Sequence, residues 1–335
     1  MAQKDVTFTE VDTTTMKNIS CAVESFSHKS NLVIDHINKE IINPLESDTG
    51  LNSVPTVIPP SFNVASYVNQ SSLLQNMVKL GVAIHQWDNI HDCHSWILKL
   101  NFEKDVQPVI RFLVDTGITP DSLGKFFTHN PHILKTSPQD LEVRRNYLES
   151  KKFTPEMIAR ICSRNPFWLL FSTEKIDNRL GFFQQLFHLT GNELRSVTVK
   201  EPRLITGKLD KVKDMNFGFQ EEMGFEVDQI KTLLLLKPKL WIMNKSILVE
   251  RFDYLHNVIK LDHETIIQFP RVLTCRVFRL RQRHEFLQYM NRNQYDPKLP
   301  NYVSPLQIIS DSDISFAVQV AKSSIQSFND FCKTL

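Results

Sequence analysis

A column of arginines at one repeated spacing is the feature of this sequence most suited to chemistry. Each member stands thirteen residues after a proline that is followed by a short apolar run. The column consists of Arg144, Arg179, Arg251 and Arg283, with Met215 at the same position of one further repeat. Guanidinium groups in a row suit a phosphate backbone, where contacts between opposite charges dominate the affinity. The alternative is structural: each arginine pairs with an acidic neighbour, such as Asp177 or Asp253, or with a helix C-terminus.

A second set of basic residues lies closer to the same prolines. The residues one place after the proline are Arg203, Lys239 and Arg271, and those six places after it are Lys208 and Arg276. These positions flank the start of the following helix, where backbone N–H groups also favour phosphate. Phosphate contacts and ordinary solvated side chains are both consistent with this pattern.

The densest basic stretch lies near the C-terminal end of the chain. It contains Arg271, Arg276, Arg279, Arg281 and Arg283. Three of them, at positions 276, 279 and 283, are three or four residues apart, which predicts one shared helix face. Because like charges on one face repel each other, we interpret this stretch as a contact for a polyanion.

The charge is unevenly distributed along the chain. Residues 1–100 carry 6 basic and 10 acidic side chains, whereas residues 101–296 carry 30 basic and 24 acidic ones. This difference predicts that the acidic N-terminal third stays away from a polyanion.

Other kinds of site find little support in the sequence. The group His85, His91, Cys93 and His94 does not match the ligand spacing of a closed zinc site, and no Ser–His–Asp signature, nucleophile elbow or Walker loop is present. We therefore predict a protein that is not an enzyme and needs no metal or cofactor. Five scattered cysteines favour a reducing compartment. No apolar run approaches the length of a membrane span, so we expect no membrane insertion.

The prolines that set this spacing also define the architecture. They recur at intervals of 32 to 36 residues, as Pro131, Pro166, Pro202, Pro238 and Pro270. Seventeen residues after them stand the apolar residues Leu148, Phe183, Phe219, Leu255 and Leu287. This pattern predicts an all-α fold of repeats of about 35 residues, each with a long helix, a second helix that ends at the proline, and a short helical turn. One such unit cannot bury its own apolar face, so we expect the units to stack into a curved α-solenoid. Trp168 and Trp241, which follow marking prolines, are predicted to belong to the core.

Three segments are expected along the chain. Residues 1–65 are predicted to be a weakly structured N-terminal segment and linker, rich in proline and polar residues. Residues 66–296 hold the helical repeats. Residues 297–335 are predicted to form a loop and a capping helix near Asp313–Lys333.

The sequence resembles the mitochondrial transcription termination factor family. The resemblance is carried by the proline-marked repeats, by residues 101–106 and 177–183, and by residues 295–304, which are similar to one animal subgroup of the family. It covers roughly residues 75–335. The resemblance implies a half-doughnut-shaped solenoid with a basic groove, a location in the mitochondrial matrix, and binding to mitochondrial DNA, ribosomal RNA or both. It also implies a role in transcription regulation or ribosome assembly, and family members can recruit protein partners.

Together these observations predict a non-enzymatic, monomeric, nucleic-acid-binding regulator of mitochondrial gene expression. The alternative is an α-solenoid scaffold that holds a helix or peptide of another protein without binding nucleic acid. The N-terminus mixes Asp5, Glu10 and Asp12 with Lys4 and Lys17. An import peptide should be basic and poor in acids, so either it has been removed or targeting is not visible in this sequence.

Overall fold

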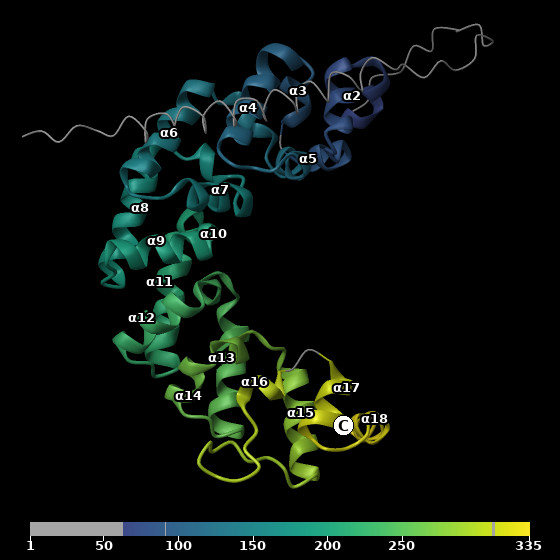
Figure 1. Cartoon of the computed structure of the whole chain (residues 1–335), viewed down its shortest axis with the longest axis vertical. Helices are drawn as coiled ribbons and strands as arrows, with labels where there is room; N and C mark the ends of the chain where they lie inside the picture. The colour runs from purple at the N-terminus through teal and green to yellow at the C-terminus, as the bar shows by residue number, and fades with distance from the viewer. Residues whose placement is uncertain (1–62, 91, 310–311) are drawn as a thin grey trace, which may run out of the picture. The chain divides into compact units, whose positions relative to one another are not determined.

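The computed structural model describes residues 63–90, 92–309 and 312–335, which contain helices and turns but no strand (Figure 1). This composition confirms the predicted all-α fold. The chain divides into two compact units, one ending at Thr173 and one beginning at Glu174. The predicted N-terminal segment, residues 1–65, falls almost wholly outside the described residues. Its last part already begins a 3₁₀ helix at Val64.

The described part of the first unit consists of α-helices and short helical turns. Its elements in chain order are η1 (Val64–Gln70), α2 (Ser72–Lys79), η2 (Ile84–Asn89), α3 (Cys93–Ile97), η3 (Phe102–Val106), α4 (Gln107–Asp115), α5 (Pro120–His129), η4 (Pro131–Lys135), α6 (Pro138–Ser150), α7 (Pro155–Arg164) and η5 (Trp168–Leu170).

The second unit continues the same order of elements. They are α8 (Thr173–Leu186), α9 (Gly191–Lys200), α10 (Pro202–Thr206), α11 (Leu209–Phe217), η6 (Gly218–Glu222), α12 (Val227–Leu236), η7 (Pro238–Ile242), α13 (Lys245–Asp253), η8 (Tyr254–Val258), α14 (His263–Gln268), η9 (Pro270–Thr274), α15 (Val277–Tyr289), α16 (Pro305–Ile308), α17 (Asp313–Ser315), η10 (Phe316–Val320) and α18 (Ile325–Cys332).

Each repeat has the three parts predicted from the prolines. In the first complete example, α6 is the long helix, α7 the second helix, and η5 the short turn that follows Pro166. We call this third part the stub of the repeat; the other stubs are η4, α10, η7 and η9. Ser137 caps α6 and Asn244 caps α13 with side-chain acceptors, because the first N–H groups of a helix have no partner within it.

A left-handed residue ends the first helix of every repeat. Residues with positive φ recur at intervals of 35 or 36, namely Gly81, Gly117, Lys152, His188, Gly224 and Lys260. The apolar residue that follows each one is buried and donates its N–H back to the helix, for example from Phe153 to the Leu148 carbonyl at 3.1 Å. This hydrogen bond closes the helix end and turns the chain toward the second helix. In the repeats of α11 and α13 the first helix ends in a π-helical turn, η6 or η8, which inserts one residue before this cap.

The core follows the predicted columns. Leu148, Phe183, Phe219, Leu255 and Leu287 are all buried. The two tryptophans predicted to be core are also buried, and the Trp241 ring lies 4.7 Å from the Phe219 ring, centroid to centroid. The apolar positions of the repeat therefore form the interior of each unit, as the spacing predicts.

The last part of the chain departs from the repeat in one element. Pro305 stands 35 residues after Pro270 and begins α16, in the position of a stub, but a loop replaces the second helix between α15 and α16. The single helix expected near Asp313–Lys333 is divided into α17, η10 and α18. Ser324, the N-cap of α18, accepts a hydrogen bond from the Ser327 N–H and begins a new helix there.

One glycine allows two backbones of the first unit to meet. A Cβ on Gly124, within α5, would lie 2.4 Å from the Leu80 carbonyl oxygen and 2.5 Å from the Gly81 carbonyl carbon. Only a residue without a side chain permits this approach between α5 and the end of α2.

Candidate nucleic-acid interface

The arginines of the predicted column point toward the stub of their own repeat. Arg144 donates to the Leu169 carbonyl, Arg179 to the Ile205 carbonyl at 2.8 Å, and Arg251 to the Leu273 carbonyl at 3.1 Å. Each acceptor stands three residues after the proline that begins the stub. Backbone carbonyls at the end of a short helix have no partner within it, so each guanidinium satisfies one of them. These contacts correspond to the helix C-terminus alternative considered for this column.

Arg283 makes the same contact in the least exposed setting. Its side chain is fully buried, and its Nη1 atom donates to the Ile308 carbonyl at 2.8 Å. Its Nη2 atom lies 2.6 Å from an Asp313 carboxylate oxygen, and its guanidinium lies 4.7 Å from the centre of the Phe316 ring. Burial lowers the pKa of Arg283, and the hydrogen bond that Arg283 donates to Asp313 opposes that shift. A guanidinium held in this way ties α15 to α16 and α17.

The repeat that lacks the column arginine reaches its stub with a different residue. Met215 is buried, whereas Lys211, one helical turn earlier on α11, donates from Nζ to the Ile242 carbonyl at 3.3 Å. Residues four apart lie on the same side of a helix, which is why Lys211 reaches the same stub. Sequence reasoning missed Lys211 because it lies outside the arginine column.

The basic residues beside the prolines lie on the surface of the second unit. Arg203, Lys239 and Arg271 occupy the second position of their stubs and are exposed, as are Lys208 and Arg276. In the first unit the residues that follow the marking prolines are His132 and Phe167, so this column is basic only in the second unit.

Two of these cations, Lys239 and Arg271, lie near a third basic residue, Lys237, where two consecutive stubs begin. Lys237 directly precedes Pro238; its pKa is lowered by burial and then by the charges of Arg271 and Lys239. Lys237 is therefore close enough to Arg271 and to Lys239 to be repelled by the charge of each. We name Lys237, Lys239 and Arg271 the stub cluster. Lys237 was absent from the sequence prediction because the predicted basic positions all follow a marking proline, whereas Lys237 precedes one.

The dense arginine stretch separates into exposed and buried members. Arg276 is the N-cap residue of α15 and is exposed, and Arg281 lies 4.0 Å from Glu285 with 58% of its side chain accessible. Arg279 lies 3.5 Å from Asp313, the carboxylate that also contacts Arg283. The face predicted for residues 276, 279 and 283 is therefore divided, because Arg283 is directed into the core.

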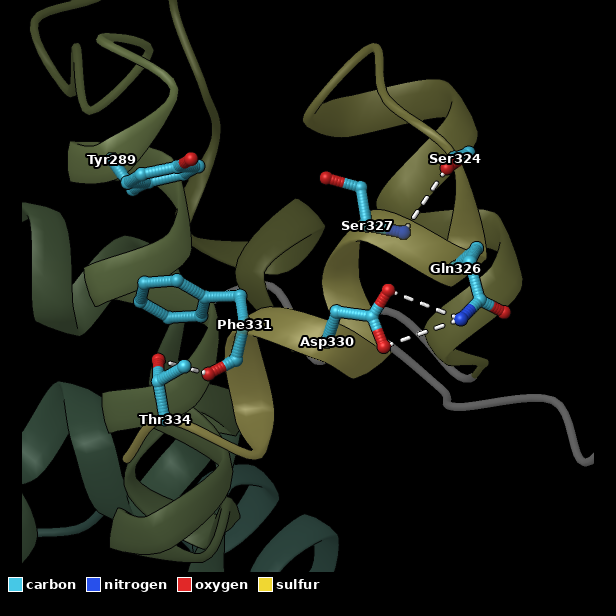
Figure 2. Close-up of a pocket in the computed structure, with 7 residues that line it drawn as sticks. All are labelled: Tyr289, Ser324, Gln326, Ser327, Asp330, Phe331 and Thr334. Carbon is cyan, nitrogen blue, oxygen red and sulfur yellow. Dashed lines mark hydrogen bonds between the residues drawn. The ribbon is translucent and has the colours of Figure 1, made fainter.

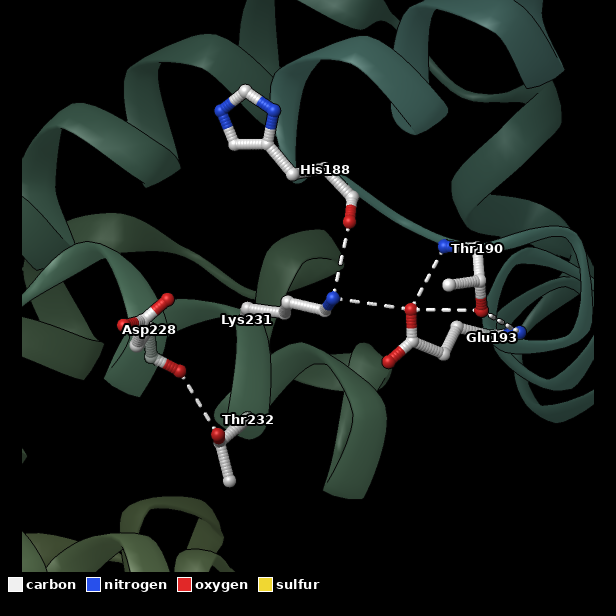
Figure 3. Close-up of polar contacts among 6 residues, drawn as sticks. All are labelled: His188, Thr190, Glu193, Asp228, Lys231 and Thr232. Carbon is white, nitrogen blue, oxygen red and sulfur yellow. Dashed lines mark hydrogen bonds and ion pairs between the residues drawn. The ribbon is translucent and has the colours of Figure 1, made fainter.

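Several other lysines of the second unit are bound to acidic partners. Figure 3 shows Lys231 of α12 between two groups near the start of α9: its Nζ lies 3.0 Å from the His188 carbonyl oxygen and 3.1 Å from Glu193. Glu193 also accepts from the Thr190 N–H and so completes the cap of α9. Lys245 likewise lies 2.8 Å from both Asp214 and Glu222. These lysines link neighbouring repeats.

A hollow of about 550 Å³ at the C-terminal end is chemically unlike a phosphate site. It lies beside α18, where the rings of Tyr289 and Phe331 face each other 5.4 Å apart (Figure 2). Its one charged lining residue is Asp330, which accepts hydrogen bonds from Gln326 and Lys333. A carboxylate without a lining cation does not attract a polyanion.

The described residues hold neither a candidate metal site nor a candidate membrane span. They contain no group of three or more His, Cys, Asp or Glu side chains arranged to hold a metal ion, and His91 lies outside them. In the same part of the chain, no helix combines the length and the apolar character needed to cross a bilayer.

Proline-marked three-part repeats, with arginine contacts inside each repeat and a basic surface on the stubs, define a class of helical-repeat protein. Comparison with known proteins identifies the family within this class. The mTERF family model matches residues 21–316, and the chain belongs to that family. Membership implies a repeated helical solenoid and a non-enzymatic nucleic-acid-binding protein, in agreement with the predictions from the sequence.

Individual relatives give the same assignment. The chain is 45% identical over 275 residues to "Transcription termination factor 3, mitochondrial" of Drosophila melanogaster, covering 82% of this chain and 78% of the relative. It is 41% identical to the protein of the same name from Rattus norvegicus, covering 82% of this chain and 67% of the relative. "Transcription termination factor 4, mitochondrial" of Mus musculus is 24% identical over 234 residues, 68% of this chain and 66% of the relative.

Proposed function

We propose that this protein regulates mitochondrial gene expression by gripping nucleic acid with the basic surface of its second unit. The observation that carries the proposal is the stub cluster, in which burial and the charges of Arg271 and Lys239 lower the pKa of Lys237, while Lys239 and Arg271 are exposed on two consecutive stubs. Like charges held together on a surface cost free energy, and a phosphate backbone relieves that cost. Arg203, Lys208 and Arg276 extend the basic surface to neighbouring stubs and to the start of α15.

The arginine column has a different part in this proposal. Arg144, Arg179, Arg251 and Arg283 hold each first helix against its stub, and in this way Arg179 and Arg251 position Arg203 and Arg271, the basic residues of their own stubs. Arg279 and Arg281 remain candidate phosphate contacts at the edge of the surface, although each has a carboxylate within 4.0 Å.

The names of the relatives support a proposed location and biological process. Their names place them in mitochondria and describe transcription termination, and we propose a matrix protein that acts on mitochondrial DNA, ribosomal RNA or both. If the nucleic acid is ribosomal RNA, the same proposal assigns the protein a role in ribosome assembly. Import of a fluorescent fusion into mitochondria, followed by protease protection after outer-membrane rupture, tests the location.

The nucleic-acid proposal is tested by salt dependence. We expect the K237A/K239A/R271A variant to bind duplex DNA and stem-loop RNA more weakly, and its slope of log affinity against log salt to flatten by about 2–3 between about 50 and about 200 mM salt. Fluorescence anisotropy with both probes measures the slope and shows which nucleic acid is preferred.

A matched control removes the same charge from positions outside the stubs. The K152N/K260N/K322N variant replaces three exposed lysines with positive φ, a backbone conformation that asparagine tolerates. Lys152 and Lys260 lie in the loop between first and second helices, away from the stub that follows the second helix. We expect the control to retain most of the wild-type slope. Equal slopes for both triple variants would contradict the proposed surface.

A further inference from the structure

The first unit carries a groove whose charge is opposite in sign to that of the stub cluster. Two hollows, of about 500 and about 250 Å³, lie side by side and share Asp115 at the end of α4. The smaller is lined by α4 and the start of α6, and the larger by α6, α7 and the loop after α4. We call the two together the α4–α6 groove.

The floor of the groove is apolar. Phe112 and Pro108 contribute to the smaller hollow, and Ile158 and Ala159 to the larger one. Gly117, the left-handed residue after α4, lines the larger hollow and has no side chain to cover the floor: a Cβ there would be 2.9 Å from the Ala159 Cβ. The groove can therefore receive an apolar side chain of a ligand.

The rim of the groove is acidic. Five carboxylates line the two hollows, Glu103, Asp115, Glu142, Glu149 and Glu156, against two guanidiniums, Arg111 and Arg145. Five acids less two bases give the rim a net charge of −3. A hydrogen bond from the side chain of Thr154 lowers the pKa of Glu156, so this carboxyl stays ionised at neutral pH.

Arg145 does not reverse the sign of the rim. Its guanidinium contacts Glu142 and lies 3.7 Å from Glu149, so one cation of α6 is shared by two carboxylates. It also lies 5.8 Å from the centre of the Phe112 ring, at the junction of the two hollows. A cation of a ligand, placed at this junction, would have carboxylates on both sides.

We propose that the α4–α6 groove docks a basic segment of a partner protein, which places an apolar side chain on the floor and lysine or arginine side chains against the rim. Charge complementarity favours this occupant, because a negative rim attracts a cationic segment and repels a phosphate backbone. The first unit then recruits protein while the second binds nucleic acid. The groove lies wholly within the first unit, so the docking proposal does not depend on the nucleic-acid proposal.

The probe for this site is a fluorescein-labelled helical peptide with leucine at every third or fourth position and lysine elsewhere. Its control carries glutamate in place of lysine. We expect the lysine peptide to bind the full chain. The E149K/E156K variant should bind this peptide with an affinity at least about tenfold lower. A159Q, which fills the floor without changing the charge, should weaken binding as well.

A matched variant separates the groove from general acidity. Asp121 is exposed in the first turn of α5, at the position that Glu156 holds in α7, so D121K changes the charge of an equivalent helix start outside the groove. We expect D121K to bind the lysine peptide as the wild type does, whereas E156K alone should not. Circular dichroism confirms that each variant is folded.

The proposal is overturned if the glutamate peptide binds equally well, or if D121K and E156K lose the same affinity. Loss of self-association in E149K/E156K, without loss of peptide binding, would assign the groove to a second copy of this chain instead. Nucleic-acid affinity measured on the same variants should not fall, whereas the K237A/K239A/R271A variant should keep its peptide affinity. Failure of one proposal is thus distinguishable from failure of the other.

Discussion

The guanidinium of Arg283 donates a hydrogen bond to the carbonyl of Ile308 at 2.8 Å, across the loop that joins α15 to α16. Ile308 stands three residues after Pro305, as Ile205 does after Pro202 and Leu273 after Pro270. The same contact between first helix and stub therefore persists where the second helix is missing. Its recurrence identifies the arginine as the element that holds the stub in place.

Replacing Arg283 should destabilise the second unit. Arg283→Met leaves the Ile308 carbonyl without this donor and Asp313 without its closest cation, and we expect a loss of about 2–4 kcal/mol in the free energy of unfolding. Urea denaturation of the full chain measures it. Arg281→Met is the control, because its exposed side chain lies 4.0 Å from Glu285 and should change the stability by less than about 0.5 kcal/mol.

The same variant also separates a structural role from a phosphate contact. At a temperature where R283M is folded, its nucleic-acid salt slope should equal that of the wild type, because a fully buried guanidinium does not reach a phosphate. A slope that fell with unchanged stability would contradict this assignment.

The proline spacing predicts the repeats because proline acts locally. It removes an N–H and biases the residue before it away from the helix, so the second helix ends at the same place in every unit. Pro305 continues this spacing, but no second helix precedes it. The sequence therefore did not predict a repeat there. The spacing therefore encodes the stub more reliably than it encodes the helix that precedes it.

The direction of the arginine column could not be predicted in the same way. Equal spacing indicates that Arg144, Arg179, Arg251 and Arg283 point in a similar direction, but their acceptors are backbone carbonyls, which no residue type marks. The α4–α6 groove was also invisible in the sequence, because the residues of α4, α6 and α7 that line it come together only through the packing of these helices.

Two glycine substitutions should have opposite effects on stability. Gly124→Ala places a Cβ 2.4 Å from the Leu80 carbonyl oxygen, so the backbones of α5 and the end of α2 must separate, at a cost of about 1–3 kcal/mol. Gly181→Ala, within α8, meets nothing within 4 Å and should stabilise the chain by about 0.5–1 kcal/mol through helix propensity. Thermal unfolding of both variants checks the pair; destabilisation by both would contradict the distinction.

Acidification should destabilise the second unit through His284. His284 lies on α15 and its ring is buried. Its Nδ1 lies 2.7 Å from the hydroxyl of Tyr295, in the loop that follows α15, and its Nε2 has no hydrogen-bond partner. Burial lowers the pKa of His284 below its ordinary 6.5. The unfolded chain therefore binds the proton more readily, so stability is complete above pH 6.5 and is lost as the pH falls from there toward the folded pKa.

Urea denaturation at about pH 7.5 and about pH 5.5 measures this effect. His284→Gln should reduce the difference between the two values, because the titrating ring is absent. A smaller slope should remain, since burial also lowers the pKa of His132. A variant with the full wild-type pH dependence would exclude His284 as its source.

Lys231 should stabilise the junction between two repeats of the second unit. Lys231→Met removes the donor to the His188 carbonyl and the cation beside Glu193, which itself caps α9 (Figure 3). The hydrogen bond to the carbonyl is expected to contribute about 1 kcal/mol, whereas the ion pair weakens as salt rises. Thr232→Ala is the control, because that hydroxyl donates to the Asp228 carbonyl of its own helix. Urea midpoints at low and high salt should show a loss for K231M that shrinks with salt but does not vanish; equal midpoints for K231M and T232A would mean that this junction adds nothing to stability.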